Sequence, residues 1–267
     1  MSLPSSQDPH GGAALVLATR QGGVLTLTMN RPAQYNALSA GLMDALQAEL
    51  DRAAADPAVR VVVLAAAGKA FCAGHDLREM RAEPSLGYYN RLFAQCSKMM
   101  MSIQRMPQPV IARVQGIATA AGCQLVGMCD LAVAAQDARF AVSGVNLGLF
   151  CSTPSVALSR NLGRKQAFEM LVTGEFIDAP TARERGLVNA VVPADQLDAE
   201  VGRITAAICA KPAVAIAAGK GLFYRQLEMG IEAAYQLAGQ TMACNMMDEA
   251  ALEGVQAFID KRPPDWK

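Results

Sequence analysis

The sequence predicts an α/β core followed by a C-terminal region made only of helices, and three observations lead to this prediction. Two strand-like runs within residues 14–30 are joined by a Gln-Gly-Gly hairpin signal. Further apolar runs at residues 59–66 and 110–114 are separated by a segment whose apolar residues have helical spacing. From Ala194 onward, every segment has the pattern of a helix.

The predicted strands are short, apolar and bounded by turn residues. The nearly continuous apolar run VRVVVLAA at residues 59–66 is typical of a strand that is covered on both faces. Pro32 and Pro193 follow the second and the last strand and end them. The predicted strands are residues 14–20, 24–30, 59–66, 110–114, 131–135, 139–142 and 187–192.

The predicted helices have apolar residues three or four positions apart. Ser39 is expected to cap the first of them, and Asp56-Pro57 ends it. Residues 33–38 and 68–76 are predicted to be loops. The predicted helices are residues 39–55, 86–106, 124–128, 153–161, 164–173, 179–185, 196–210, 212–228, 231–245 and 248–260.

Composition excludes several classes of function. Acidic and basic side chains balance at 24 each, so nothing favours binding to nucleic acid or to an anionic membrane. The two histidines, His10 and His75, are too few for a histidine-based metal site, and no metal is expected. No apolar run approaches the ~20 residues that a membrane-spanning helix needs.

The cysteines and the N-terminus favour a cytoplasmic protein. The seven cysteines are odd in number and have no paired CxxC spacing, which is typical of a reduced compartment. The first residues, MSLPSSQDPHGG, lack the charged and apolar regions of a signal peptide. We therefore expect a disordered tail at residues 1–13, a core at 14–193 and a helical region at 194–267. A helical region that is apolar on more than one face is expected to oligomerise.

The stretch from Val110 to Asp130 is the centre of the functional prediction. A buried strand there ends in very small residues at 118–123 and continues as a helix. The first N–H groups of a helix lack acceptors within it and, helped by the helix dipole, suit a developing negative charge. Tight packing of a strand against a helix also favours glycine and alanine, so both interpretations stay open for this stretch.

A second loop, residues 69–77, also follows a buried strand and carries small residues at its turn. It is placed to direct the backbone N–H of His75 into a cleft. Together with the N–H of Ala121, this donor would form a two-donor oxyanion hole. Donors of this kind are each worth about 3–4 kcal/mol in acyl-transfer sites.

Several short motifs are spread along the chain from about residue 14 to residue 266, each weak alone and specific together. They are Asn30-Arg31-Pro32, Asn36-Ala37-Leu38, Phe71-Cys72-Ala73-Gly74-x-Asp76-Leu77, Gly116-x-Ala118-x-Ala120-x-Gly122-Cys123-x-Leu125, Cys129-Asp130, Phe140, Leu171-x-Thr173-Gly174, Ala182-x-x-x-Gly186-Leu187-Val188 and Glu253-Gly254-x-x-Ala257-Phe258-x-x-Lys261-Arg262. In these motifs the chain resembles the crotonase, or enoyl-CoA hydratase/isomerase, superfamily.

The resemblance implies a spiral of ββα units with a helical region that forms trimers, often paired into hexamers. It also implies an acyl-CoA thioester as ligand, its carbonyl held by the N–H groups of His75 and Ala121. Coenzyme A would be part of the substrate, no permanently bound cofactor is expected, and the implied activity is that of a lyase or isomerase of fatty acid metabolism. The residues implied in coenzyme A binding are Ala33, Gln34, Tyr35, Ala73, Asp76, Leu77, Arg78, Phe258 and Lys261, the last two sometimes from a neighbouring subunit.

Two positions depart from the pattern of the family. Its hydratases use two glutamates, one to activate water and one to supply the proton for the α-carbon, and the matching positions here hold Gln124 and Gly144. An amide is no base and glycine has no side chain, and losing a positioned acid or base costs about 10²–10⁴ in rate. Ordinary hydration is therefore not expected. Changing Gln124 and Gly144 together to glutamate is expected to restore some of it.

Two functions stay open. One is an acyl-CoA enzyme with altered chemistry, such as a hydrolase, a decarboxylase or an isomerase. The other is a non-catalytic acyl-CoA-binding or regulatory oligomer. The two apparently intact donor loops favour the first function, and the missing glutamates favour the second.

Other polar groups near the expected substrate have assigned roles. Cys151 is a nucleophile only if its thiolate is stabilised, and a buried inert cysteine is the favoured interpretation. The imidazole of His75 is not expected to act as a base. Asp76 and Asp130 are expected to hold turns through local backbone bonds. The remaining polar candidates, expected to face or orient the substrate, are Gln124, Ser143, Asn146 and Ser152.

Overall fold

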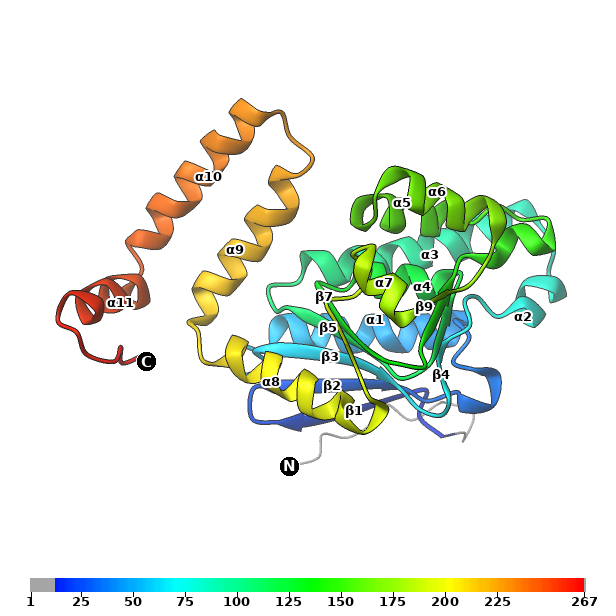
Figure 1. Ribbon diagram of the computed structural model, residues 1–267, viewed down its shortest axis with the longest axis horizontal. Helices are drawn as coiled ribbons and strands as arrows, with labels where there is room; N and C mark the ends of the chain where they lie inside the picture. The colour runs from blue at the N-terminus through cyan, green and yellow to red at the C-terminus, as the bar shows by residue number, and fades with distance from the viewer. Residues whose placement is uncertain (1–12, 267) are drawn as a thin grey trace.

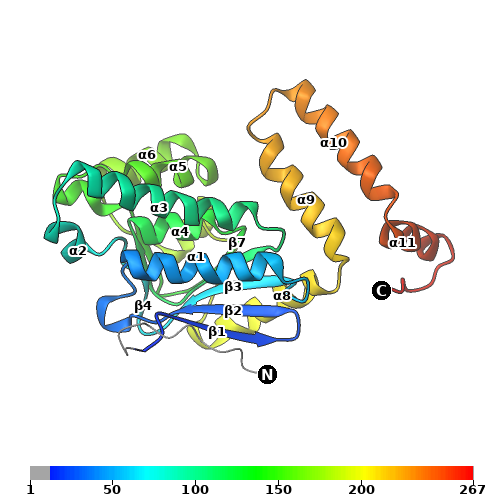
Figure 2. The same cartoon turned by 180° about the vertical axis from the view of Figure 1, so that it is seen from behind.

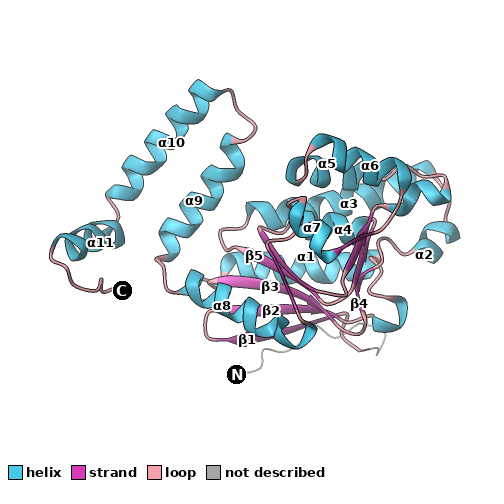
Figure 3. Ribbon diagram, viewed as in Figure 1, coloured by secondary structure: helices cyan, strands magenta, loops and turns pink. Residues whose placement is uncertain are grey.

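The computed structural model describes residues 13–266, so residues 1–12 of the predicted N-terminal tail lie outside the described residues. Within the described range the chain forms two β-sheets, helices on both sides of the larger sheet, and a helical arm that extends away from this core (Figure 1). Figure 3 shows that the strands all lie in the core and that the arm is helical.

The larger sheet has six strands in the order β1-β2-β3-β5-β7-β10. β1 and β2 are antiparallel and are joined by the predicted hairpin turn, where Gly22 has a φ of +58°, a conformation that favours glycine. The other neighbouring strands are parallel. The strands are β1 (Val16–Gln21), β2 (Val24–Met29), β3 (Val61–Ala66), β5 (Val110–Val114), β7 (Leu131–Ala135) and β10 (Ala190–Val192).

The smaller sheet has four short strands in the order β4-β6-β8-β9, of which the first three are parallel. The chain visits the two sheets in turn, since β3 leads to β4, β5 to β6 and β7 to β8. This alternation is the spiral of ββα units implied by the resemblance. The strands are β4 (Ala70–Cys72), β6 (Ile117–Thr119), β8 (Arg139–Ala141) and β9 (Ile177–Asp178).

The helices agree with the predicted ones except for α2, which the sequence did not reveal. Ser39 caps α1 as predicted, because its side chain accepts a hydrogen bond from the Leu42 N–H. The helices are α1 (Ala40–Ala55), α2 (Leu77–Ala82), α3 (Leu86–Arg105), α4 (Ala121–Met128), α5 (Ser152–Asn161), α6 (Arg164–Thr173), α7 (Ala179–Glu184), α8 (Leu197–Cys209), α9 (Ala213–Gln226), α10 (Ile231–Met246) and α11 (Glu249–Ile259). Three short 3-10 helices are η1 (Pro32–Gln34), η2 (Ser143–Leu147) and η3 (Ala194–Gln196).

Four strands differ from the prediction, among them β9, which the sequence did not reveal. The predicted loop at residues 68–76 contains β4, and β6 lies in the stretch of small residues before α4. Strands of three residues are too short to show an alternating pattern. β10 begins later than predicted because Gly186, with a φ of +89°, turns the chain and the Leu187 N–H bonds back to the Ala182 carbonyl.

Both faces of β3 are buried, as its apolar run predicts. Val62 and Leu64 belong to the main hydrophobic cluster, together with side chains of α1, α3 and α4. Val61 and Val63 face the other way and pack with Val201 of α8. Figures 1 and 2, which view the molecule from opposite sides, show α8 over one face of the sheet and α1 over the other. Helix α8 therefore completes the core, and the arm begins after it.

The arm consists of α9, α10 and α11 (Figure 1). In the described part of the chain no single helix is long and apolar enough to cross a membrane. The segment 194–209 and α9 satisfy the length and composition of a span only when taken together, and the chain bends by 104° between them.

Candidate active site

Three neighbouring parallel strands of the smaller sheet end at the same edge. β4 pairs with β6 through Cys72 and Ala118, and β6 pairs with β8 through Thr119 and Ala141. The carboxyl ends of parallel strands are where α/β folds place their ligands. The segments that follow these strands are residues 73–80, 120–128 and 143–154. The fold thus brings together the two predicted donor loops and adds a third segment.

Gly122, in the first turn of α4, lies directly against β4. A Cβ atom at this position would collide with the carbonyl oxygen of Cys72, so the approach requires glycine. The packing interpretation of the small residues therefore holds for Gly122. The close contact of Gly122 with β4 brings the start of α4 next to the loop after β4. A Cβ atom on Gly74, in that loop, would lie 2.9 Å from the Cβ of Ala120 and 3.4 Å from the backbone nitrogen of Ala121.

Ala120 turns the chain sharply ahead of α4. Its φ of 51° and ψ of −120° are rare for a residue with a side chain, and such conformations cost on the order of 1–3 kcal/mol. Within residues 13–266 neither the Ala121 N–H nor the His75 N–H has a hydrogen-bond acceptor. Two free backbone donors on adjacent loops are the arrangement of an oxyanion hole.

The loop that carries His75 is held by the loop at residues 33–38. The Leu38 N–H donates to the Gly74 carbonyl at 2.7 Å, and the Asp76 N–H donates to the Leu38 carbonyl at 3.1 Å. These two bonds flank His75 and leave its own N–H unpaired. The donor is therefore positioned by its neighbours.

Asp76 fixes the far end of the same loop. Its carboxylate accepts hydrogen bonds from the N–H groups of Arg78 and Glu79 at the start of α2 and forms an ion pair with Arg31 at 3.1 Å. The prediction that Asp76 holds a turn through local backbone bonds is confirmed.

A cavity of about 270 Å³ opens at this edge of the sheet. Its wall is formed by residues of the segment 73–80, which includes His75, by Ala120 and Ala121, by Phe93 of α3 and by residues of the segment 143–154. Small-molecule sites have volumes of roughly 300–1,000 Å³, so this space suits an acyl group rather than a whole coenzyme. Among the described residues, no aspartate, glutamate, lysine or arginine lines it.

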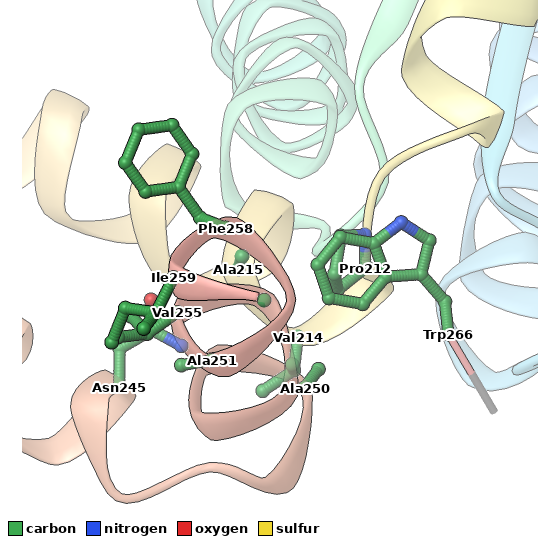
Figure 4. A pocket seen from close by; sticks show the side chains of 11 residues that line it. Pro212, Val214, Ala215, Asn245, Ala250, Ala251, Val255, Phe258, Ile259 and Trp266 are labelled. Carbon is green, nitrogen blue, oxygen red and sulfur yellow. The ribbon is translucent and has the colours of Figure 1, made fainter. Parts of the chain in front are cut away.

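A larger hollow of about 460 Å³ lies in the arm, between the start of α9, α11 and Trp266 (Figure 4). Its lining side chains are apolar apart from Asn245, and the indole of Trp266 lies beside α11. It contains neither donor loop, so the catalytic candidate is the smaller cavity in the core. In the described chain no group of three His, Cys, Asp or Glu side chains is placed to hold a metal ion.

A family model described as enoyl-CoA hydratase/isomerase matches residues 19–267. The chain belongs to the enoyl-CoA hydratase/isomerase family. The superfamily predicted from the motifs is thereby confirmed.

Relatives and solved structures agree with this family. Enoyl-CoA hydratase domain-containing protein 3, mitochondrial, of Xenopus laevis is 45% identical over 252 residues, which cover 94% of this chain and 86% of that protein. A crystal structure of enoyl-CoA hydratase from Mycobacterium smegmatis is 64% identical with a TM-score of 0.94, covering 95% of this chain and 99% of that one. The crystal structure of human enoyl coenzyme A hydratase domain-containing protein 3 is 42% identical with a TM-score of 0.92. The match covers 94% of this chain and 100% of that one. The predicted crotonase fold is confirmed.

Of the two positions where the hydratases of this family have glutamates, Gln124 does not line the cavity. It is buried in α4, and its Oε1 accepts no hydrogen bond from the described residues. The prediction that Gln124 orients the substrate therefore has no support in the lining of the cavity.

Gly144 does line the cavity, but it has no room for a side chain. A Cβ atom there would lie 2.5 Å from the carbonyl oxygen of Leu149 and 2.7 Å from the Sγ of Cys151. No residue larger than glycine is accommodated unless the segment 143–151 moves. This contact argues against the expectation that glutamates at positions 124 and 144 restore hydration, which stays a prediction.

The other polar candidates divide into two groups. Ser143, Cys151 and Ser152 line the cavity, whereas Asn146 does not and instead donates to the Gly174 carbonyl at 3.5 Å. The Sγ of Cys151 accepts a hydrogen bond from the Gly144 N–H at 3.3 Å. Burial raises the pKa of this thiol, which keeps it protonated and inert, as predicted.

The imidazole of His75 forms part of the cavity wall and meets the ring of Phe93 edge-on, with 5.5 Å between centroids. Burial lowers the pKa of His75 from 6.5 to about 4, so the ring is neutral at pH 7. Its Nε2 is buried without a hydrogen-bond partner among the described residues. A ring with so low a pKa is a weak base, in line with the prediction that it is not the catalytic base.

The residues implied in coenzyme A binding fall in two places. Ala33, Gln34 and Tyr35 are exposed, and the Tyr35 carbonyl accepts a hydrogen bond from the Ala73 N–H at 3.0 Å, next to the cavity. Leu77 lines the cavity, and Arg78 is exposed beside it. Phe258 and Lys261 belong to the end of the arm, away from the cavity of the same chain (Figure 1). Their role in binding stays a prediction.

Sequence reasoning missed much of the apolar wall. Met80, Phe93, Leu147, Leu149 and Phe150 all line the cavity. The only signal was the apolar character of the segment after β8, which has no regular period.

Proposed function

We propose that this protein binds an acyl-CoA thioester whose carbonyl oxygen accepts hydrogen bonds from the N–H groups of His75 and Ala121. The observation that carries the proposal is the pair of unpaired backbone donors at the wall of one cavity. Backbone donors placed before the ligand arrives stabilise negative charge on a carbonyl oxygen without reorganisation. In this arrangement Ala33, Gln34, Tyr35, Ala73, Asp76, Leu77 and Arg78 lie along the coenzyme, and the Arg78 guanidinium suits its phosphates.

Titration calorimetry with butyryl-CoA, octanoyl-CoA and free coenzyme A tests the binding. We expect micromolar affinity for the thioesters and weaker binding of free coenzyme A. The variant Ala121→Pro removes one donor, at the first position of α4. It is expected to weaken thioester binding at least about 10-fold, given what one hydrogen bond contributes. Undetectable binding of both thioesters, or equal binding by the variant, would reject the proposal.

We infer that the protein acts on its thioester through the polarised carbonyl, as a hydrolase, decarboxylase or isomerase, and not as an ordinary hydratase. The cavity offers hydroxyl groups of Ser143 and Ser152 but no carboxylate. The second candidate, a non-catalytic acyl-CoA-binding oligomer, is favoured by the same lack of a side chain that could transfer a proton near pH 7.

A panel of enoyl-, malonyl- and saturated acyl-CoAs separates these two candidates. Turnover of any member above background favours the enzyme, and binding without turnover favours the non-catalytic oligomer. Crotonyl-CoA hydration is expected to be absent from the wild type and from the Gln124→Glu/Gly144→Glu variant, because Gly144 cannot accept a side chain. Hydration at the rate of a family hydratase in either protein would contradict this account.

We also propose that the chain assembles as a trimer or a hexamer and works in the cytoplasm. Support for assembly comes from the apolar side chains exposed along the arm, and support for a reduced compartment comes from the seven cysteines, all of them free. In such an assembly Phe258 and Lys261 would be available to the coenzyme of a neighbouring subunit.

A further inference from the structure

The outer wall of the cavity exposes large apolar side chains at one place. Leu77, Leu147, Leu149 and Phe150 are between 44% and 68% exposed and all line the cavity. They come from two segments that are distant in sequence, the start of α2 and the segment after β8. A cluster of exposed apolar side chains around an opening marks a binding surface for an apolar group.

Three polar groups of the same wall are engaged with the protein itself. The hydroxyl of Ser143 lies 3.0 Å from the Thr119 hydroxyl, and the Ser152 hydroxyl donates to the Phe150 carbonyl at 3.3 Å. The Cys151 thiol accepts from the Gly144 N–H. Among the wall groups, the Nε2 of His75 has no partner in the described residues, and it belongs to a neutral ring.

The wall also carries no charge that could pair with an anion. In the part of the chain that the structure describes, no lysine or arginine lines the cavity. The imidazole of His75 is neutral at pH 7 because burial lowers its pKa to about 4. A carboxylate placed against this partly exposed wall would lose part of its hydration without gaining a cation, which disfavours binding.

We propose that the cavity selects acyl groups with an unsubstituted apolar tail and rejects acyl groups that end in a carboxylate, with Leu77, Leu147, Leu149 and Phe150 as the selecting side chains. Among the reactions proposed above, this selection excludes a decarboxylase. This inference rests on the proposed function, because it assumes that the thioester carbonyl is held at His75 and Ala121. From that point the acyl chain has only the apolar wall to follow. The occupant of the surface is therefore the tail of the thioester itself.

Hexanoyl-CoA and adipoyl-CoA provide a matched pair of ligands. Their carbon chains have equal length, and they differ in a terminal methyl group or carboxylate. By titration calorimetry at pH 7 we expect adipoyl-CoA to bind at least about 100-fold more weakly, the effect of an unpaired charge. A difference below about 10-fold, or a preference for adipoyl-CoA, overturns the selection while leaving the proposed thioester site intact. Binding of neither ligand overturns the proposed function, and the selection with it.

A charge placed on the wall tests the assignment of the side chains. Leu149→Lys adds a cation at a cavity position that is 50% exposed, and Val156→Lys adds one on α5 at a position that is 51% exposed and does not line the cavity. We expect Leu149→Lys to lower the ratio of the two dissociation constants by about 2- to 5-fold, as one partly exposed ion pair allows. Val156→Lys is expected to leave the ratio unchanged. An unchanged ratio in Leu149→Lys, or equal changes in both variants, overturns the placement of the acyl tail at Leu149.

Discussion

Gly74 lies between the two backbone donors, and its φ of +91° is a conformation that residues with side chains rarely adopt. The neighbouring Ala120 adopts a similarly rare conformation and does carry a side chain. Only one of the two residues can have a Cβ atom, because two would lie 2.9 Å apart. The distance between the His75 and Ala121 N–H groups therefore depends on position 74 being glycine while position 120 is alanine.

The substitution Gly74→Ala tests this dependence. Because the new methyl group meets Ala120 and the Thr119 carbonyl, we expect acyl-CoA binding to weaken at least about 10-fold. We expect the free energy of unfolding to fall by about 1–3 kcal/mol. Titration calorimetry and urea denaturation measure the two effects.

Gly22→Ala is the matched control, since Gly22 also has a positive φ but a Cβ atom there meets nothing within 4 Å. It is expected to lower stability through backbone strain alone and to leave binding unchanged. Retention of wild-type affinity by Gly74→Ala would show that the donors are not placed by this contact.

His75 is expected to make stability depend on pH. The unfolded chain takes up a proton at this ring near pH 6.5, whereas the folded chain does so near its pKa of about 4. Between these values the unfolded state binds more protons, so stability rises with pH through this window and is lost as pH falls. The contribution is on the order of 2–3 kcal/mol.

Urea denaturation of the wild type and of His75→Gln at pH 4.5 and pH 7 measures this contribution. The variant keeps the backbone N–H and removes the titrating ring, so its loss of stability on acidification is expected to be smaller. Equal losses in the two proteins would mean that other groups cause the acid sensitivity.

Among the elements, the three short parallel strands of the smaller sheet create the site, and they were the hardest to predict. The sequence revealed the long helices and the buried strands of the larger sheet, because these are long enough to show a period. β4 and β6 have three residues each, and only the contact of Gly122 with Cys72 shows why small residues follow them. The motifs identified His75 and Ala121, but the apolar wall depends on tertiary contacts that no local pattern encodes.

Helix α9 is joined to the core by a buried polar cluster. Lys220 donates hydrogen bonds to the Asp130 carboxylate at 2.6 Å and to the carbonyls of Ile103 and Gln108, both at 2.8 Å. The hydroxyl of Tyr224 donates to the same carboxylate at 2.8 Å. Asp130 follows α4, so one carboxylate connects the helix of the donor site with the first helix of the arm.

Removing the cation from this cluster is expected to lower the free energy of unfolding. Lys220→Met leaves the Asp130 carboxylate without its ion-pair partner, and loss of one partner of a buried pair costs about 3–5 kcal/mol. Arg203→Met removes one partner of the exposed pair with Glu200 and is expected to change stability by less than about 0.5 kcal/mol. Urea denaturation at one protein concentration measures both. Similar small losses in the two variants would count against a structural role for the cluster.

At the scale of the whole molecule, the core and the arm differ in how well they bury their apolar residues. The core encloses two hydrophobic clusters, one on each face of the larger sheet. Large apolar side chains are exposed along the arm, including Phe258, which is 85% exposed. The others include Ile231, Tyr235, Met242, Met247 and Ile259. An extended arm with this surface is stable when a second copy covers it.

Sedimentation equilibrium is expected to give three or six times the chain mass of 28.2 kDa. The substitution Ile231→Asp places a charge on the exposed face of α10 and is expected to dissociate the assembly. Leu17→Asp, on the exposed side of the edge strand β1, is the control and is expected to leave it intact. A monomeric wild type would contradict the predicted trimer or hexamer.

The crowding around Gly144 also bears on how such a protein can evolve. A glycine codon can become a glutamate codon by one nucleotide change, but here the new side chain would meet the carbonyl of Leu149 before it reached any ligand. The path of the main chain from residue 144 to residue 151 would have to be rebuilt first. An acid at this position is therefore not gained by the change of one residue alone, because the surrounding main chain must change with it.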